Sequence, residues 1–179
     1  MKLKISKTLL ESALIFQAKK DVRHYLNGIF FMRDGRVAAT DGHRAFIGGM
    51  HENKLRSDII VKVSKSPTQA YSYAAIDTRT KIVTYHDGTD TMVGAGICEQ
   101  IDGKFPDIDR VIPKEKSPAE EIGFNAKYLA DVEKAAKLFN PKFEGVLFEL
   151  NGSTSAAVAN LSSPEGLAAK IIVMPMRIK

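Results

Sequence analysis

The sequence predicts an α+β fold built from three repeated units, each with a strand, a helix and several antiparallel strands. Two observations support this prediction. Helix-capping residues recur after short alternating strands, and tight-turn dipeptides recur after each helical stretch. The capping residues are Ser6, Ser64 and Asn125, which are spaced by 58 and 61 residues.

Each unit is expected to begin with a strand that runs into a helix. KLKIS precedes KTLLESALIFQAKK, IIVKVS precedes KSPTQAYSYAA, and EIGFN precedes AKYLADVEKAAKLF. A side-chain oxygen at the capping position satisfies a free N–H of the first helical turn. Pro67 is compatible with the second helix, because it falls in the first turn, where its missing N–H costs least.

The remainder of each unit predicts antiparallel strands around a tight turn. GIFFM and RVAAT flank Asp34-Gly35, KIVTYH and TMVGAGI flank Asp87-Gly88, and GVLFEL and SAAVAN flank Asn151-Gly152. Asp-Gly and Asn-Gly supply the positive φ that tight hairpins need. AFIGGM and AAKIIVMPM add a further strand to the first and third units.

The units divide the chain into one complete domain and one additional half. Residues 1–57 and 58–115 form the domain over 1–115, and residues 119–179 form a single unit after the proline-bracketed linker 113–118. Units of this size bury little surface alone, so neighbours should pair their helices and sheets. The odd third unit leaves a helix face and a sheet edge to cover, so self-association is expected.

Composition bounds the class of protein. The chain has 179 residues, enough for a sizeable core, and its one cysteine, Cys98, has no partner for a disulfide. No apolar run approaches the roughly 18 residues of a membrane span, and the amino terminus lacks the apolar stretch of a signal peptide. A cytoplasmic location is therefore expected. The net charge of +5 permits a nucleic-acid partner.

Catalytic and metal-binding patterns are absent from the sequence. The four histidines are scattered, and no nucleophile elbow, Walker loop or zincin helix is present. Asp87–Asp90 is typical of a hairpin turn rather than of a calcium loop. We therefore expect no catalytic residue, no metal site and no cofactor, so the protein is expected not to be an enzyme.

Five strings resemble the bacterial sliding clamp, the β subunit of DNA polymerase III. They are KDVRHYLNG at 20–28, ATDGHRAF at 39–46, DGKFPDIDRVIP at 102–113, IGFNAKYLADV at 122–132 and VMPMRIK at 173–179. Their order also matches the family. The earlier strings resemble its middle domain and exit linker, and the last two resemble the closing half of its third domain.

The resemblance implies a DNA-clamp fold, in which helices line a central hole and antiparallel sheets lie outside. It implies a non-catalytic processivity factor of DNA replication that encircles duplex DNA without regard to sequence. DNA polymerase and other clamp-binding proteins, with a clamp loader, are the implied partners. Because this chain carries three of the usual six units, four copies would supply a twelve-unit ring, and a homotetramer is expected.

The resemblance also implies a peptide-binding pocket. Matching positions, carried over residue by residue, are Leu26, Thr40, Gly42, His43, Arg44, Pro106, Arg110, Val111, Val173, Met174, Pro175, Met176 and Arg177. The two methionines give an adaptable apolar lining, and the arginines are expected to orient polar groups of a peptide. Two departures from the family alter the pocket, Ala45 in place of the usual leucine and the terminal Ile178-Lys179.

Contact with DNA phosphates is expected from clustered side chains near the three helices. These are Lys19, Lys20, Arg23, Tyr25, Lys62, Lys65, Lys127, Lys134 and Lys137. Asp131 interrupts the last three, which share one side of the third helix.

Two other functions remain open from the sequence. The first is a non-encircling clamp mimic from a phage or mobile element, which would recruit or sequester clamp-binding proteins. The second is an unrelated enzyme of mixed α and β structure. Retention on nicked circular DNA distinguishes a ring from a mimic, and turnover without partner proteins would indicate the enzyme.

Overall fold

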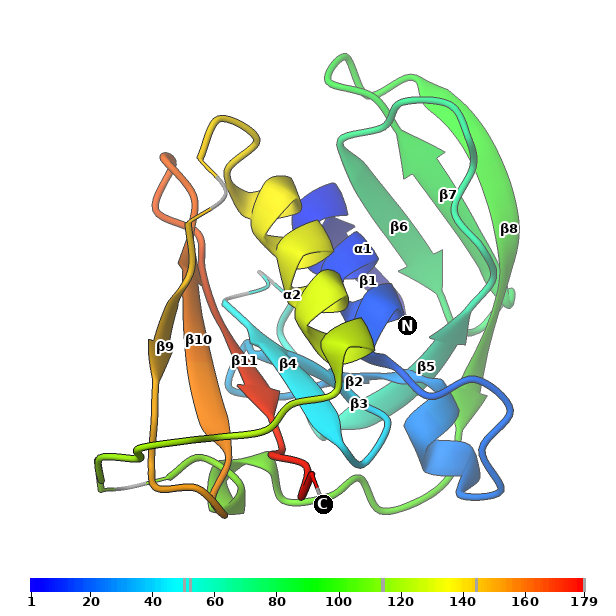
Figure 1. Cartoon of the computed structure of the whole chain (residues 1–179). Coiled ribbons are helices and arrows are strands. Elements are labelled where there is room, and N and C mark those ends of the chain that lie inside the picture. Colours follow the sequence, from blue (N-terminus) through cyan, green and yellow to red (C-terminus); the bar gives the residue numbers. More distant parts are fainter. Residues whose placement is uncertain (50, 52, 114, 144, 179) are drawn as a thin grey trace.

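The computed structural model in Figure 1 describes residues 1–49, 51, 53–113, 115–143 and 145–178. Lys114 of the predicted linker and Lys179 of the tail lie outside the described residues. The helices are α1 (Lys7–Phe16) and α2 (Ala126–Phe139), with short 3₁₀ turns at His24–Asn27 and Ile108–Arg110. The strands are β1 (Lys2–Ser6), β2 (Ile29–Phe31), β3 (Val37–Thr40), β4 (Arg44–Gly48), β5 (Ile59–Val63), β6 (Tyr73–Asp77), β7 (Ile82–His86), β8 (Met92–Ile101), β9 (Leu147–Glu149), β10 (Ala157–Ser162) and β11 (Ala168–Val173).

The described strands form one antiparallel sheet that curves around the two helices (Figure 1). Its order is β1-β6-β7-β8-β5-β2-β3-β4-β11-β10-β9. The strand β8 bridges the two halves, because it pairs with β7 over its first part and with β5 over its last part. The predicted α+β class, with helices inside an antiparallel sheet, is confirmed. None of the described helices has the length and apolarity of a membrane span.

Both helices begin at the predicted capping residues. Ser6 Oγ accepts a hydrogen bond from the Leu9 N–H, and Asn125 Oδ1 accepts one from the Lys127 N–H. The apolar residues of α2 recur at helical spacing, and its buried face consists of Val132, Ala135, Ala136 and Phe139. That face packs toward α1 and the concave side of the sheet.

The sheet buries a cluster on each face. The concave cluster joins both helices to inward-facing side chains of the sheet, including Phe46, whose ring lies 6.1 Å from that of Phe16 and 6.3 Å from that of Phe139. The convex cluster is smaller. It is covered by segment 105–112, where Phe105 stacks on Phe30 with ring centres 4.5 Å apart.

The predicted helix after Ser64 does not form. Residues 64–72 have no helix, and β6 follows with the alternating burial of a strand, Ala74 and Ile76 being fully buried. Ser64, expected to cap a helix, instead pairs with β8: its N–H donates to the Ile97 carbonyl (2.9 Å) and its Oγ accepts from the Ile97 N–H (3.1 Å). The prediction was wrong because the apolar residues from Tyr71 onward fit the period of a strand.

Helix pairing also differs from the prediction. The first helix was expected to pair with a helix of the second unit, but α1 packs against α2 of the third unit. In addition, β4 of the first unit pairs with β11 of the third, with Arg44 opposite Val173. The third helix is therefore not left unpartnered. Segment EIGFN, expected to be a strand, is irregular, and Gly123 in it accepts a hydrogen bond from the Met176 N–H (2.7 Å).

The predicted turns form, with one difference in their backbone. Gly35 and Gly152 adopt positive φ values of 97° and 78°, as the Asp-Gly and Asn-Gly signals predict. In the third turn, the residue with positive φ is Asp90 (62°) and not Gly88. The Asp87 carboxylate organises this loop, because it accepts hydrogen bonds from the Thr89 and Thr91 N–H groups.

Candidate functional site

The structure joins two of the three predicted pocket segments directly. The pairing of β4 with β11 brings the loop 40–44 beside the tail, where the Met174 N–H donates to the His43 carbonyl over 2.9 Å. The loop itself is tight. Thr40 Oγ1 donates to the Arg44 carbonyl (2.7 Å) and accepts from the Gly42 N–H (3.0 Å), and Gly42 has a φ of 92° that favours glycine.

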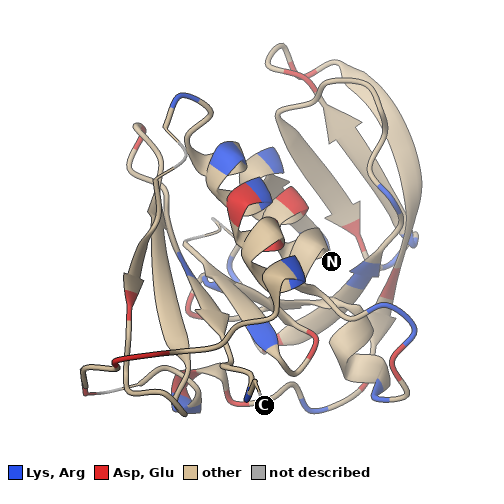
Figure 2. Ribbon diagram, viewed as in Figure 1, with Lys and Arg blue, Asp and Glu red and all other residues tan. Residues whose placement is uncertain are grey.

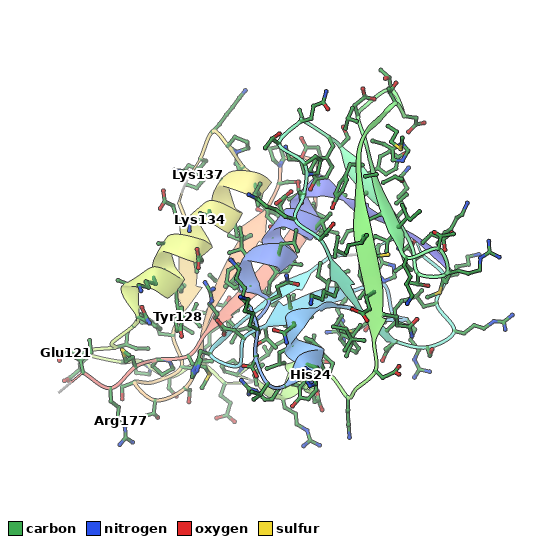
Figure 3. The ribbon with its side chains drawn as sticks, turned by 90° about the vertical axis from the view of Figure 1, so that its right-hand side faces the viewer. His24, Glu121, Tyr128, Lys134, Lys137 and Arg177 are labelled. Carbon is green, nitrogen blue, oxygen red and sulfur yellow. The ribbon has the colours of Figure 1, made fainter. Side chains whose placement is uncertain are left out.

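The tail exposes apolar side chains at this junction. Val173 is fully buried as the last residue of β11, whereas Met174 and Met176 are 38% and 51% exposed. Pro175 is half-buried and Arg177 is exposed. The backbone of Met176 is held by Gly123, so these thioether side chains lie on a fixed segment. Figure 3 shows Arg177 and Glu121 at the same corner of the molecule.

The third predicted segment packs on the convex face of the sheet. Ile108 belongs to the convex cluster together with Ala45 and Ile172, which are the neighbours of Arg44 and Val173 in the sequence. The predicted pocket residues of this segment are exposed. They are Pro106, Arg110 and Val111. The family's leucine is replaced by Ala45, which is buried in the sheet.

Two predicted pocket residues have internal contacts instead. Leu26 is 1% exposed, so it offers almost no surface to a ligand. Arg44 forms ion pairs with Asp41 and Asp131, and its guanidinium lies over the rings of Phe16 and Tyr128. It therefore ties the loop to α2, and its contact with a peptide stays a prediction. Of the two arginines, Arg110 is the exposed one.

Two residues that contact Arg44, Asp131 and Tyr128, were not among the predicted site residues. Asp131 was interpreted as an interruption of a lysine stripe, but its carboxylate accepts from both Arg44 and Lys134. Burial acts to raise the pKa of Asp131, and the hydrogen bonds from Lys134 and Arg44 outweigh it, so the pKa is lowered. Tyr128 lies one turn before Asp131 on α2, and its ring lies 6.3 Å from that of His43.

The predicted DNA-contacting side chains are divided between faces. Lys127, Lys134 and Lys137 lie on the exposed side of α2, and Figure 3 shows the last two along that helix. Lys134 pairs with Asp131 and Lys137 with Glu133, so positive and negative charges alternate on this surface (Figure 2). The exposed face of α2 is therefore mixed rather than strongly basic.

A groove beside α1 contains two more of the predicted lysines. Lys19 and Lys65 line an open groove of about 790 Å³ between α1 and the segment where the second helix was expected. Its apolar walls include Leu14, Ile15 and Pro67. Close approach of this segment to β8 depends on glycine, because a Cβ on Gly94 would lie 3.0 Å from the Cβ of Pro67.

The remaining predicted contacts lie elsewhere. Lys20 is exposed after α1, and Arg23 forms an ion pair with Asp21. Tyr25 packs against the convex cluster. Lys62 alternates along β5 with Val61 and Val63, which face the helices, so it lies on the opposite side of the sheet. The structure thus places Tyr25 and Lys62 away from the helix face.

The described residues do not form a site typical of metal chemistry. No group of three or more His, Cys, Asp or Glu side chains within the described ranges is placed to hold a metal ion. Cys98 is buried, and desolvation raises the pKa of its thiol, which disfavours the thiolate.

Comparison with curated proteins identifies relatives of the chain. A Beta sliding clamp from Salmonella typhimurium is 32% identical over 163 residues, which cover 86% of this chain and 44% of the relative. Another from Proteus mirabilis is 31% identical over 176 residues, covering 93% and 47%. The chain spans about half the length of the curated relatives it matches. No family model matches it.

Comparison with solved structures confirms the fold. The DNA polymerase III subunit beta from Pseudomonas aeruginosa matches 99% of this chain and 67% of its own chain, with a TM-score of 0.67 and 20% sequence identity. The clamp fold that the five sequence strings indicate is therefore present.

Proposed function

We propose, on the premise that this chain is a half-length homologue of the bacterial beta sliding clamps, that it is a non-catalytic DNA clamp. It encircles duplex DNA as an oligomeric ring and tethers DNA polymerase or other replication proteins through a peptide-binding surface. The observation that carries the proposal is the junction of the loop 40–44 with the tail, which places exposed Met174 and Met176 on a rigid sheet end.

The peptide surface fits a short segment with bulky apolar residues and a glutamine. Methionine side chains adapt to irregular apolar partners, and the exposed backbone around the tail offers hydrogen-bond groups to a glutamine amide. Arg110, whose side chain is 85% exposed, is expected to meet polar groups of such a peptide. Because Ala45 replaces a larger residue and is buried, we expect partner preferences that differ from those of full-length clamps.

The DNA-facing surface is the outer side of α2 with the groove beside α1. Lys127 and Lys134 lie on the helix, and Lys19 and Lys65 line the groove. Lysine ammonium groups contact phosphates without reading bases, so binding is expected to be independent of sequence. The acidic side chains between them limit the strength of each contact, which suits a protein that slides.

Ring formation rests on the sheet edges rather than on an unpaired helix. Self-association was expected from an uncovered helix face and sheet edge of the third unit, but the helix α2 packs against α1. The sheet still ends in two edge strands, β1 and β9, and edge strands are surfaces on which further strands pair. A homotetramer joined through such edges, loaded by a clamp loader, stays the proposed assembly.

The test is retention on DNA of different topology. The protein is loaded with a clamp loader and ATP onto nicked circular DNA and separated by gel filtration. We expect co-elution with the circle and release when one cut linearises it, because a ring slides off a free end. Direct binding would instead survive linearisation, and that result would contradict encirclement.

The second candidate is a non-encircling clamp mimic that recruits or sequesters clamp-binding proteins. Two observations favour it. The chain spans about half the length of its relatives, and Lys134 and Lys137 of α2 are paired with acidic neighbours. Peptide binding without any retention on nicked circles would support the mimic over the ring.

A further inference from the structure

The outer face of the sheet is covered over only one of its halves. Segment 105–112 and the convex cluster lie over the half that contains β2, β3, β4 and β5, and among the described residues no member of that cluster comes from β1, β6 or β7. In the uncovered half, Ile82 of β7 lies opposite Ile97 of β8. These two residues are 46% and 73% exposed, so they form an apolar surface on the outside of the molecule.

Alternation along the strands places this isoleucine pair on the face away from the helices. Val83 and Cys98, the next residue of each strand, belong to the concave cluster that contains both helices. Neighbouring residues of a strand point to opposite faces, so Ile82 and Ile97 point outward. Single exposed apolar residues are ordinary, but two directly opposite each other on neighbouring strands form a contiguous patch that a partner covers.

Positive charges border the isoleucine pair. Lys2 of β1 lies opposite Asp77 of β6, and Asp77 lies opposite Ile82. Arg79 and Lys81 belong to the turn that leads into β7, and all three basic residues are exposed. None of the three side chains forms an ion pair with another described residue. We refer to Lys2, Arg79 and Lys81 as the basic border.

The acidic residues of this face already have basic neighbours. The Asp77 carboxylate accepts a hydrogen bond from the Arg79 N–H over 3.0 Å, and it lies 3.7 Å from the amino-terminal ammonium group. Glu99 of β8 lies opposite Lys62 of β5. The basic border is therefore left to complement carboxylates of a ligand.

Segment 105–112 shows how the covered half of the same face is occupied. Phe105 and Ile108 pack into the convex cluster. Next to them, the two carboxylate oxygens of Asp109 accept hydrogen bonds from the Arg36 guanidinium over 2.7 and 3.0 Å. The chain thus covers one half of its outer face with a segment in which apolar side chains bind the sheet and a carboxylate binds a bordering cation.

We propose that the outer face around Ile82 and Ile97 binds an acidic segment of a partner protein, in which apolar residues alternate with carboxylates. Two observations identify this occupant. The basic border complements carboxylates, and segment 105–112 covers the other half of the face with the same composition. In the sheet, β5, β2, β3 and β4 lie between β8 and β11, which carries the tail. The surface is therefore separate from the tail, and it adds a second protein-binding site to the proposed function.

The test uses a fluorescein-labelled peptide with the sequence FPDIDRVI, that of residues 105–112, and measures its binding to the full chain by fluorescence anisotropy. We expect saturable binding that Ile97→Ser weakens about tenfold, because burial of the isoleucine is lost. Val22→Ser is the matched control, since Val22 is 88% exposed between α1 and β2. It should bind as the wild-type protein does. Absence of saturable binding, or equal binding by Ile97→Ser and wild type, would overturn the proposal.

A second variant tests the acidic character of the occupant. Arg79→Ser removes one cation of the basic border and keeps the backbone N–H that Asp77 accepts, and we expect about threefold weaker binding of the peptide. The same peptide with asparagine at its two aspartate positions should bind the wild-type protein more weakly and should not distinguish Arg79→Ser from it. Equal binding of the two peptides by the wild-type protein would overturn an acidic occupant.

The same series excludes other occupants. Met176→Ala should leave binding of FPDIDRVI unchanged, and a loss with Met176→Ala but not with Ile97→Ser would assign the peptide to the tail and overturn the second site. Light scattering should give wild type and Ile97→Ser the same mass. A higher mass for wild type would mean that a second copy covers this face, which would also overturn the proposal.

The proposal and the proposed clamp function fail separately. Ile97→Ser should be retained on nicked circular DNA as the wild-type protein is, because the isoleucine pair lies on the face away from the helices. If it is retained and still binds FPDIDRVI like wild type, the clamp stands and the second site is overturned. If the peptide binds in an Ile97-dependent way without retention of either protein, the second site stands and the ring is contradicted.

Discussion

At the scale of single residues, the proposed binding of peptides depends on the methionines of the tail. Met174 and Met176 are partly exposed beside a rigid loop, whereas Met92 is exposed on β8 in another part of the sheet. The three side chains share the same chemistry and differ in their surroundings. Met92 is therefore a matched control for the binding role of the tail.

We predict that Met176→Ala weakens binding of a fluorescently labelled peptide with a glutamine and bulky apolar residues by about tenfold. The reason is that burial of a methionine against a partner contributes about 1.4 kcal/mol or more, which is a factor of ten in Kd. Fluorescence anisotropy measures it. Met92→Ala should bind as the wild-type protein does, and equal weakening by both would show that the tail has no special role.

Arg44 is a structural residue at the centre of the candidate site. Its side chain is 11% exposed and pairs with Asp41 and Asp131, which belong to the loop and to α2. Removal of one partner from a buried ion pair leaves the other charge uncompensated, which is costly. Arg110 differs, because its ion pair with Asp107 is on the surface and such pairs contribute little.

We predict that Arg44→Ala lowers the free energy of unfolding by about 3 kcal/mol, as measured by urea denaturation. The carboxylates of Asp41 and Asp131 would lose their shared cation in a poorly solvated place. Arg110→Ala should change the free energy by less than about 0.5 kcal/mol. Similar values for the two variants would mean that Arg44 is not needed to hold the loop to α2.

At the scale of elements, the segment after β5 shows how a helix can be replaced by extended chain. Residues 64–72 lie against β8 where it carries Gly94 and Gly96. A Cβ on Gly96 would overlap Ser64 Oγ, and this oxygen is also bonded to the Ile97 N–H. The sequence Gly-Ala-Gly therefore serves close packing of backbone segments.

We predict that Gly96→Ala destabilises the fold by about 1–3 kcal/mol, because Ser64 must move and lose its bond to β8. Gly88→Ala is the control: its added Cβ would lie 3.7 Å from Ser72 Oγ, an ordinary contact, and Gly88 is not among the positive-φ glycines. It should be close to neutral. Thermal unfolding followed by circular dichroism measures both, and a neutral Gly96→Ala would contradict this packing.

At the scale of the whole molecule, the curved sheet places both helices on one side. Figure 2 shows Lys and Arg intermixed with Asp and Glu along the helices, so long-range attraction of DNA is modest. The assignment of DNA contacts to the helix side rests on this placement. Lys62 lies on the outer face of β5, so it serves as a control residue for DNA binding at the helix side.

We predict a log–log salt slope for DNA binding near −3.6, if about four phosphates are neutralised. Lys127→Ala should make the slope shallower by about 0.9, because one phosphate contact is lost. Lys62→Ala should leave the slope unchanged, since that side chain is on the other face. Titration at several salt concentrations by anisotropy measures it, and a slope near zero would exclude direct contact with phosphates.

The starts of α1 and α2 and most of the strands could be predicted from the sequence, because capping and alternation of apolar residues are local signals. Ser6 and Asn125 cap helices in their own first turns, and Gly35 and Gly152 set their own hairpins. The assignment failed at 64–72, where Tyr71 and Pro67 suit both a helix start and an extended segment, and packing against glycines of β8 decides between them.

Neither the pairing of the units nor the contacts of Arg44 could be predicted from the sequence. The partner of α1 is α2, more than a hundred residues later, and the partner of Arg44 is Asp131 on that helix. Neither is visible in a local pattern, because packing of a helix and closure of an ion pair depend on what the sheet brings together in space.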